Sequence, residues 1–171
     1  MTRRNGFLLL EILLATMFIC VLFATFYQLF LQKIGSLGRI YADIELHRAA
    51  RVIISSVESE LVYSTREIVL EENKYGSMII CQNIGLRRSV VFYCRNMPNE
   101  RNKTAIYKST KIEDRTAGIN PLSSPEVSIE QWQCEKINAH TLRLKMQIKI
   151  TTLGRCKTFV EVIRLCNGCV I

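Results

Sequence analysis

The chain is poor in the side chains that enzymes use most. It has only two histidines, His47 and His140, which lie far apart in the sequence, and a single tryptophan, Trp132. It contains no glycine-rich phosphate loop, no Ser–His–Asp order and no paired-carboxylate catalytic motif. Acid–base and nucleophilic catalysis need such groups brought together. We therefore expect no enzyme, no cofactor and no metal site.

Proline is scarce, and charge is missing from one long segment. All three prolines lie in residues 97–125, so none interrupts the chain before them. Residues 12–31 carry no charge, and only Thr16, Thr25 and Gln28 are polar. About 20 such residues, at a rise of about 1.5 Å each, match a hydrocarbon core about 30 Å thick. This run predicts a transmembrane helix.

One carboxylate, Glu11, stands at the start of the apolar run. A charge at mid-bilayer costs about 2.5–3.5 kcal/mol on insertion scales, so it needs a partner or a place near the interface. A cut between Gly6 and Phe7 would create an amino group about one helical turn before Glu11. The alternatives are an ordinary anchor, in which Glu11 reaches the interface, and a secretory signal. No small-residue cleavage site follows Leu31, which disfavours the latter.

The amino-terminal segment resembles that of type IV prepilins. The resemblance rests on the basic leader with Arg3 and Arg4, the order from Gly6 to Glu11, and the apolar helix that follows. The chain departs from many relatives at Leu8, where they carry Thr or Ser.

The resemblance implies a structural role with three site residues. Prepilin peptidase would cut between Gly6 and Phe7, Phe7 would be N-methylated, and Glu11 would meet a neighbour's terminal amine during assembly. The implied protein is a minor pilin or pseudopilin of a type IV pilus, a type II secretion system or a competence pseudopilus, acting in initiation or at the tip. Its partners would be other pilins, the peptidase, the inner-membrane assembly platform and, before assembly, membrane lipid.

The implied fold is α+β and pilin-like: a long amino-terminal helix packed on an antiparallel sheet. Residues 1–6 would be the leader, 7–31 the transmembrane half of the helix, 32–62 its amphipathic half, and 63–171 an exported β domain. The amino terminus would face the cytoplasm, and the rest would lie outside it, in a filament or at the cell surface. The alternative is a membrane-tethered extracytoplasmic binding domain that does not polymerise.

Hydrophobic periodicity supports this layout independently. Two apolar stripes recur at helical spacing on different sides of residues 32–62, which suits two different partners. Their members are Ile34, Leu37, Tyr41 and Ile44 in one stripe, and Leu46, Ala50, Ile53, Val57 and Leu61 in the other. Gly35 and Gly38 could bend the helix.

Short strands are expected after Tyr63. The clearest is Thr141–Thr151, in which apolar and polar residues alternate without error, as on a sheet with one buried face. Further strands are expected at 67–71, 77–82, 89–95, 126–137 and 157–165. Residues 97–125 hold the prolines and several Asn and Gly, so we expect long loops around a short strand at 105–108. The closing strands also resemble those of J-type minor pseudopilins.

Two side-chain sets in the exported part invite further hypotheses. An even cysteine set outside the cytoplasm predicts disulfides more than zinc, with the pairing left open. These cysteines are Cys81, Cys94, Cys134, Cys156, Cys166 and Cys169. The chain carries a net charge of +8, and Arg143, Lys145 and Lys149 share the polar face of one expected strand. DNA therefore stays open as a partner, although a solvated face is favoured because stacking aromatics are absent.

Overall fold

A computed structural model describes residues 3–64, 67–83, 86–98, 100–113, 115–152, 154–166 and 169–170. Side chains are described for these residues except at 3–6, 63–64, 100–102 and 169–170. The chain divides into two compact units, Met1–Tyr41 and Ala42–Ile171. Each unit is considered by itself.

The amino-terminal third of the chain is helical, as the sequence predicts. Helix α1 spans Arg3–Ser59 and is followed by a five-residue π-helix, Glu60–Ser64. No proline interrupts α1, and it continues through Gly35 and Gly38 without a break. It contains a stretch long and apolar enough to cross a membrane.

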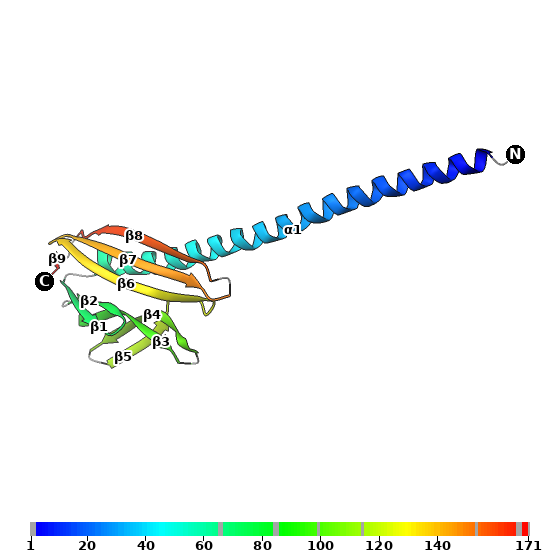
Figure 1. The fold of residues 1–171 in the computed structure, drawn as a ribbon. Helices are drawn as coiled ribbons and strands as arrows, with labels where there is room; N and C mark the ends of the chain where they lie inside the picture. Colours follow the sequence, from blue (N-terminus) through cyan, green and yellow to red (C-terminus); the bar gives the residue numbers. More distant parts are fainter. Residues whose placement is uncertain are drawn as a thin grey trace. The chain divides into compact units, whose positions relative to one another are not determined.

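The second unit holds two sheets and the last turns of α1 (Figure 1). The strands are β1 (Glu67–Asn73), β2 (Gly76–Asn83), β3 (Arg88–Met97), β4 (Glu100–Ile112), β5 (Arg115–Pro121), β6 (Val127–Asn138), β7 (Thr141–Ile150), β8 (Cys156–Arg164) and β9 (Cys169–Val170). The larger sheet has the order β5-β4-β3-β2-β1-β9, and the smaller has the order β6-β7-β8. All pairs are antiparallel except β1 with β9, which is parallel. The α+β layout with an antiparallel sheet is confirmed.

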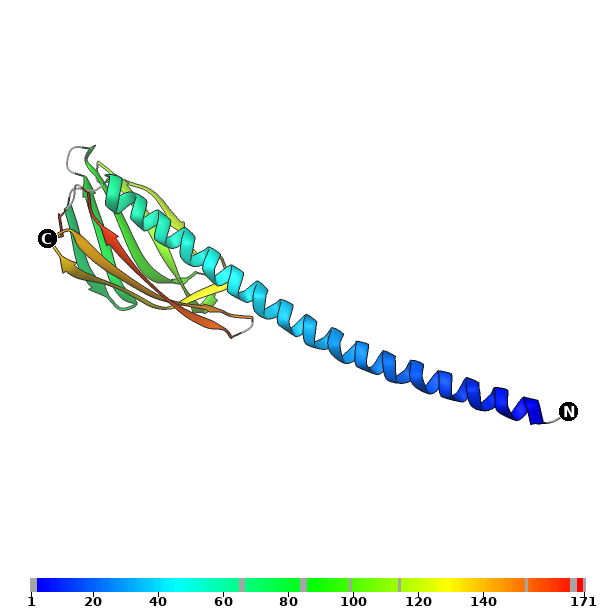
Figure 2. The same cartoon turned by 90° about the horizontal axis from the view of Figure 1, so that it is seen from above.

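The core of this unit forms between the last turns of α1 and both sheets. Figure 2 shows this part of α1, coloured cyan to green, lying along the strands. The predicted stripe is fully buried: Leu46, Ala50, Ile53, Val57 and Leu61 each expose 2% or less. Strand β7 lies between β6 and β8 and buries every second residue, as its alternation predicts. The helix stripe and this strand face therefore supply two walls of one apolar core.

The expectation of long loops at 97–125 is wrong. This segment forms β4, which is 13 residues long, and β5. Strand β5 lies at the sheet edge and is exposed along most of its length, so it needs no apolar alternation. Pro121 is tolerated because it ends this edge strand. The sequence pattern also does not predict strand β9.

Candidate functional site

The Gly6–Phe7 bond lies inside the first turns of α1, which begins at Arg3. The Phe7 side chain is 72% exposed. A protease needs an extended strand of substrate, so cleavage here requires these first turns to unwind. Met1 and Thr2 lie outside the described residues.

Glu11 is exposed on α1, and no described residue forms an ion pair with it. The two threonine hydroxyls of the apolar run form hydrogen bonds within the helix. Thr16 Oγ1 donates to the Leu13 carbonyl at 2.9 Å, and Thr25 Oγ1 donates to the Leu22 carbonyl at 2.8 Å. These internal hydrogen bonds lower the cost of placing the hydroxyls in lipid. Glu11 is thus the one charged group of the run, with its carboxylate available to a partner outside the first unit.

The first apolar stripe of the helix has no cover within the described structure. Ile34, Leu37, Tyr41 and Ile44 are 50–64% exposed. The apolar residues from Phe7 to Leu31 are exposed as well. A contiguous apolar surface of this extent marks a membrane or protein contact.

The basic face predicted on β7 is largely neutralised. Arg143 forms an ion pair with Glu135 at 3.7 Å, and Lys149 forms one with Glu130 at 3.4 Å. Lys145 lies between them on the same strand and is half-buried. Alternating charges of opposite sign give a weak field for a polyanion. The geometry therefore favours a solvated face over a DNA contact.

Two basic residues around the start of β8, the strand beside β7, are also engaged. Arg155 forms an ion pair with Asp43 at 3.2 Å. Lys157 Nζ lies 2.8 Å from His47 Nε2, and the His47 ring meets Phe159 edge-on. His47 thus forms a surface contact between α1 and β8.

The expected disulfides are not present among the described cysteines. Cys94, Cys134, Cys156 and Cys166 are free thiols, and no disulfide joins two described cysteines. Cys81 is buried in the larger sheet. The Cys169 side chain lies outside the description.

The separation of these thiols follows from the fold. Cys94 faces the core from β3, whereas Cys134 lies on β6 of the other sheet. Burial raises the pKa of Cys94 to about 11, and burial together with nearby Glu135 raises that of Cys134 to about 12. Both behave as small apolar core residues. Within the described part of the chain, no three His, Cys, Asp or Glu side chains gather as a metal site.

One buried charge cluster was missed by sequence reasoning. Glu60, in the π-helix, exposes 7% of its surface and accepts hydrogen bonds from two cations through Oε1. Arg88 Nη2 of β3 lies at 2.8 Å, and Lys108 Nζ of β4 at 2.7 Å. We call these three residues the Glu60 cluster. It fastens the end of the helical segment to the larger sheet.

Comparisons of the chain with protein-family models, with curated proteins and with solved structures found no match.

Proposed function

We propose that this protein is a minor pilin or pseudopilin: a membrane-held subunit that joins a short helical filament through its amino-terminal helix. Prepilin peptidase cuts between Gly6 and Phe7, Phe7 is N-methylated, and Glu11 pairs with the terminal amine of a neighbouring subunit. The amino terminus faces the cytoplasm before cleavage, and the β-containing unit acts outside it.

The observation that carries the proposal is the combination of an apolar surface and a single charge between Phe7 and Leu31 of α1. Apolar side chains from Phe7 to Leu31 are exposed on all sides of the helix, as in a segment surrounded by lipid or other helices. Glu11 is the single charged residue in that surface and has no described partner. Intramembrane carboxylates are costly enough that a functional partner is the default expectation.

The alternative is a tethered binding domain that does not polymerise. It has less support as a DNA-binding protein, because two of the three predicted basic contacts are paired with carboxylates. It also gives Glu11 no role.

The amino-terminal chemistry gives the first test. Mass spectrometry of protein from cells that contain a prepilin peptidase should find an N-methylated Phe7 at the amino terminus. Recovery of intact Met1 or Thr2 would contradict the proposal.

A Glu11→Ala variant tests the assembly role. The substitution makes the span more apolar, so membrane insertion and the fold of the second unit should be unimpaired. Co-purification of partner pilins should nevertheless be lost, because a charge-assisted contact in a low dielectric guides register and partner choice. Gln28→Leu is the matched control, since it also replaces a polar residue of the run by an apolar one. Normal assembly of Glu11→Ala would leave α1 as an anchor only.

A further inference from the structure

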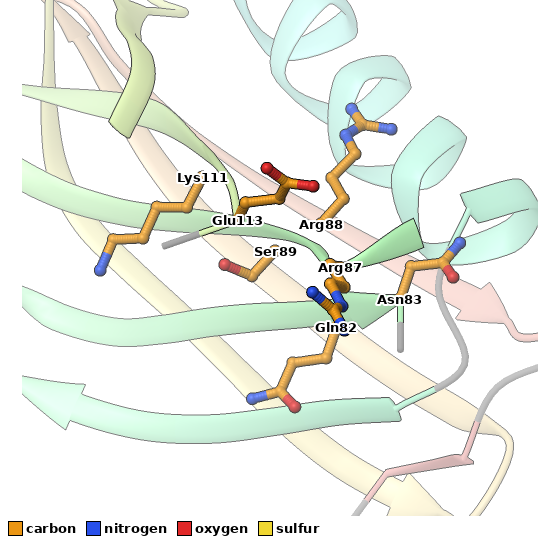
Figure 3. A pocket seen from close by; sticks show the side chains of 7 residues that line it. All are labelled: Gln82, Asn83, Arg87, Arg88, Ser89, Lys111 and Glu113. Carbon is orange, nitrogen blue, oxygen red and sulfur yellow. The ribbon is translucent and has the colours of Figure 1, made fainter. Parts of the chain in front are cut away.

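A polar pocket of about 540 Å³ lies at one end of the larger sheet (Figure 3). It is formed where the turn between β2 and β3 comes close to the turn between β4 and β5. A backbone hydrogen bond joins these turns, from the Glu113 N–H to the Arg87 carbonyl at 3.1 Å. A volume of this size accommodates a small organic ligand.

The floor of the pocket is a row of three polar side chains across neighbouring strands. Gln82 of β2 lies opposite Ser89 of β3, and Ser89 lies opposite Lys111 of β4. Residues directly opposite in an antiparallel sheet project from the same face. The adjacent pair, Cys81 and Val90, is buried in the core on the other face. The row therefore stands on the sheet's outer face.

The cations at this end of the sheet differ in whether a carboxylate holds them. Arg88 projects to the core side, where its guanidinium is held by Glu60 at 2.8 Å. Figure 3 shows it pointing toward the helical turns, away from Gln82 and Lys111. Arg87 and Lys111 form no ion pair with any described residue, in contrast to the paired cations Arg143 and Lys149 of β7. Three cations therefore line the pocket, and among the described residues only Arg88 forms an ion pair with a carboxylate.

Two residues at the rim have an unusual backbone conformation. Arg87 has φ 45° and Glu113 has φ 50°, both in the left-handed region. This conformation costs roughly 1 kcal/mol or more for a residue with a side chain. The two strained residues are joined by a backbone hydrogen bond. Their side chains, one cation and one carboxylate, both line the pocket.

We propose that this pocket binds a small phosphorylated sugar or polyol. Arg87 and Lys111 supply the charge that a phosphate group requires, and the Ser89 hydroxyl and the Gln82 amide add hydrogen-bond donors. Glu113 is an acceptor only, so it suits ligand hydroxyl groups and disfavours a bare anion. None of the described residues that line the pocket is aromatic, which disfavours a stacked nucleobase.

Calorimetric titration of the full-length chain in non-ionic detergent tests the proposal, with glucose 6-phosphate as the probe. Glucose 6-phosphate should bind more tightly than inorganic phosphate or glucose. Arg87→Asn and Lys111→Gln should each weaken this binding by about tenfold or more. Asn is chosen at position 87 because it tolerates the left-handed conformation.

Arg143→Gln is the matched control, because it removes one exposed positive charge on the other sheet. Its affinity for the probe should stay within about twofold of the parent protein. Unchanged fluorescence of buried Trp132 verifies the fold of each variant. Absence of probe binding up to about 10 mM would overturn the proposal, as that is weaker than about −3 kcal/mol. Three other results would also overturn the proposal. They are an affinity for inorganic phosphate equal to that for glucose 6-phosphate, a loss of affinity in Arg143→Gln equal to that in the pocket variants, and binding of duplex DNA but not of glucose 6-phosphate.

Discussion

Replacing Glu60 by Gln should destabilise the second unit more than any change at an exposed ion pair. Glu60 accepts from Arg88 at 2.8 Å and from Lys108 at 2.7 Å, through the same carboxylate oxygen. Glutamine keeps the shape and one acceptor oxygen but removes the charge. Arg88 and Lys108 would then lie close together as like charges, and neither forms another ion pair with a described residue.

The magnitude follows from how far the Glu60 cluster is removed from water. The side chain of Glu60 is 9% exposed, that of Arg88 31% and that of Lys108 23%. Removing one partner of a fully buried pair costs about 3–5 kcal/mol, whereas an exposed pair contributes about 0–1 kcal/mol. Partial exposure of the two cations places Glu60→Gln between these limits, at about 2–4 kcal/mol. For a unit of this size the melting temperature should fall by about 10 °C.

Thermal unfolding followed by tryptophan fluorescence measures this effect directly. Trp132 is the single tryptophan and is 1% exposed, so its emission reports on the core of the second unit. Glu135→Gln is the control, because its side chain is 60% exposed and its pair with Arg143 spans 3.7 Å. Glu135→Gln should lower the free energy of unfolding by less than about 1 kcal/mol. Added salt should abolish this difference in stability from the parent protein. If Glu60→Gln lowers stability no more than Glu135→Gln, the Glu60 cluster does not fasten helix to sheet.

The two buried thiols and one glycine give further predictions. Cys94 and Cys134 should resist iodoacetamide in the folded protein and react after denaturation, since their pKa values are raised to about 11 and about 12. Above pH 9 the unfolded chain loses these protons first, so unfolding followed by fluorescence should show stability falling as pH rises from about 9 toward 11. Gly76→Ala should cost more than about 3 kcal/mol in the same assay, because Gly76 has φ 125° and its Cβ would clash with the Trp132 carbonyl oxygen. Gly118→Ala meets open space and should be nearly neutral.

The elements that the sequence predicts correctly are those with one strongly apolar face. The stripe from Leu46 to Leu61 and the alternation of β7 are both produced by burial against the same core. Hydrophobic periodicity arises because one face of an element is buried, so it identifies such elements well. Strand β5 buries almost nothing, and β9 is two residues long, so neither leaves a periodic signal.

The candidate site residues also differ in whether a local sequence pattern identifies them. Gly6, Phe7 and Glu11 stand out because their signal is local: a charge and a junction beside an uncharged run. In the Glu60 cluster, Arg88 follows Glu60 by 28 positions in the sequence and Lys108 follows it by 48 positions. Only the register of the strands brings these side chains together. The adjacent arginines 87 and 88 look equivalent in the sequence. Both line the pocket, but Arg88 begins β3 and its guanidinium reaches Glu60, whereas Arg87 lies in the preceding turn and forms no ion pair with a described residue.

In the proposed assembly step, Glu11 is the residue that contributes most to specificity. Between Phe7 and Leu31 the exposed surface of α1 is apolar, whether lipid or neighbouring helices surround it. Lipid tails are as apolar as leucine side chains, so transfer from the bilayer into a helical filament core gains little hydrophobic free energy. The hydroxyls of Thr16 and Thr25 are already satisfied within the helix and gain nothing either. The carboxylate of Glu11 is the group whose surroundings change most, from an interface to a paired amine. The specificity of assembly should therefore reside there, while the rest of the run supplies packing.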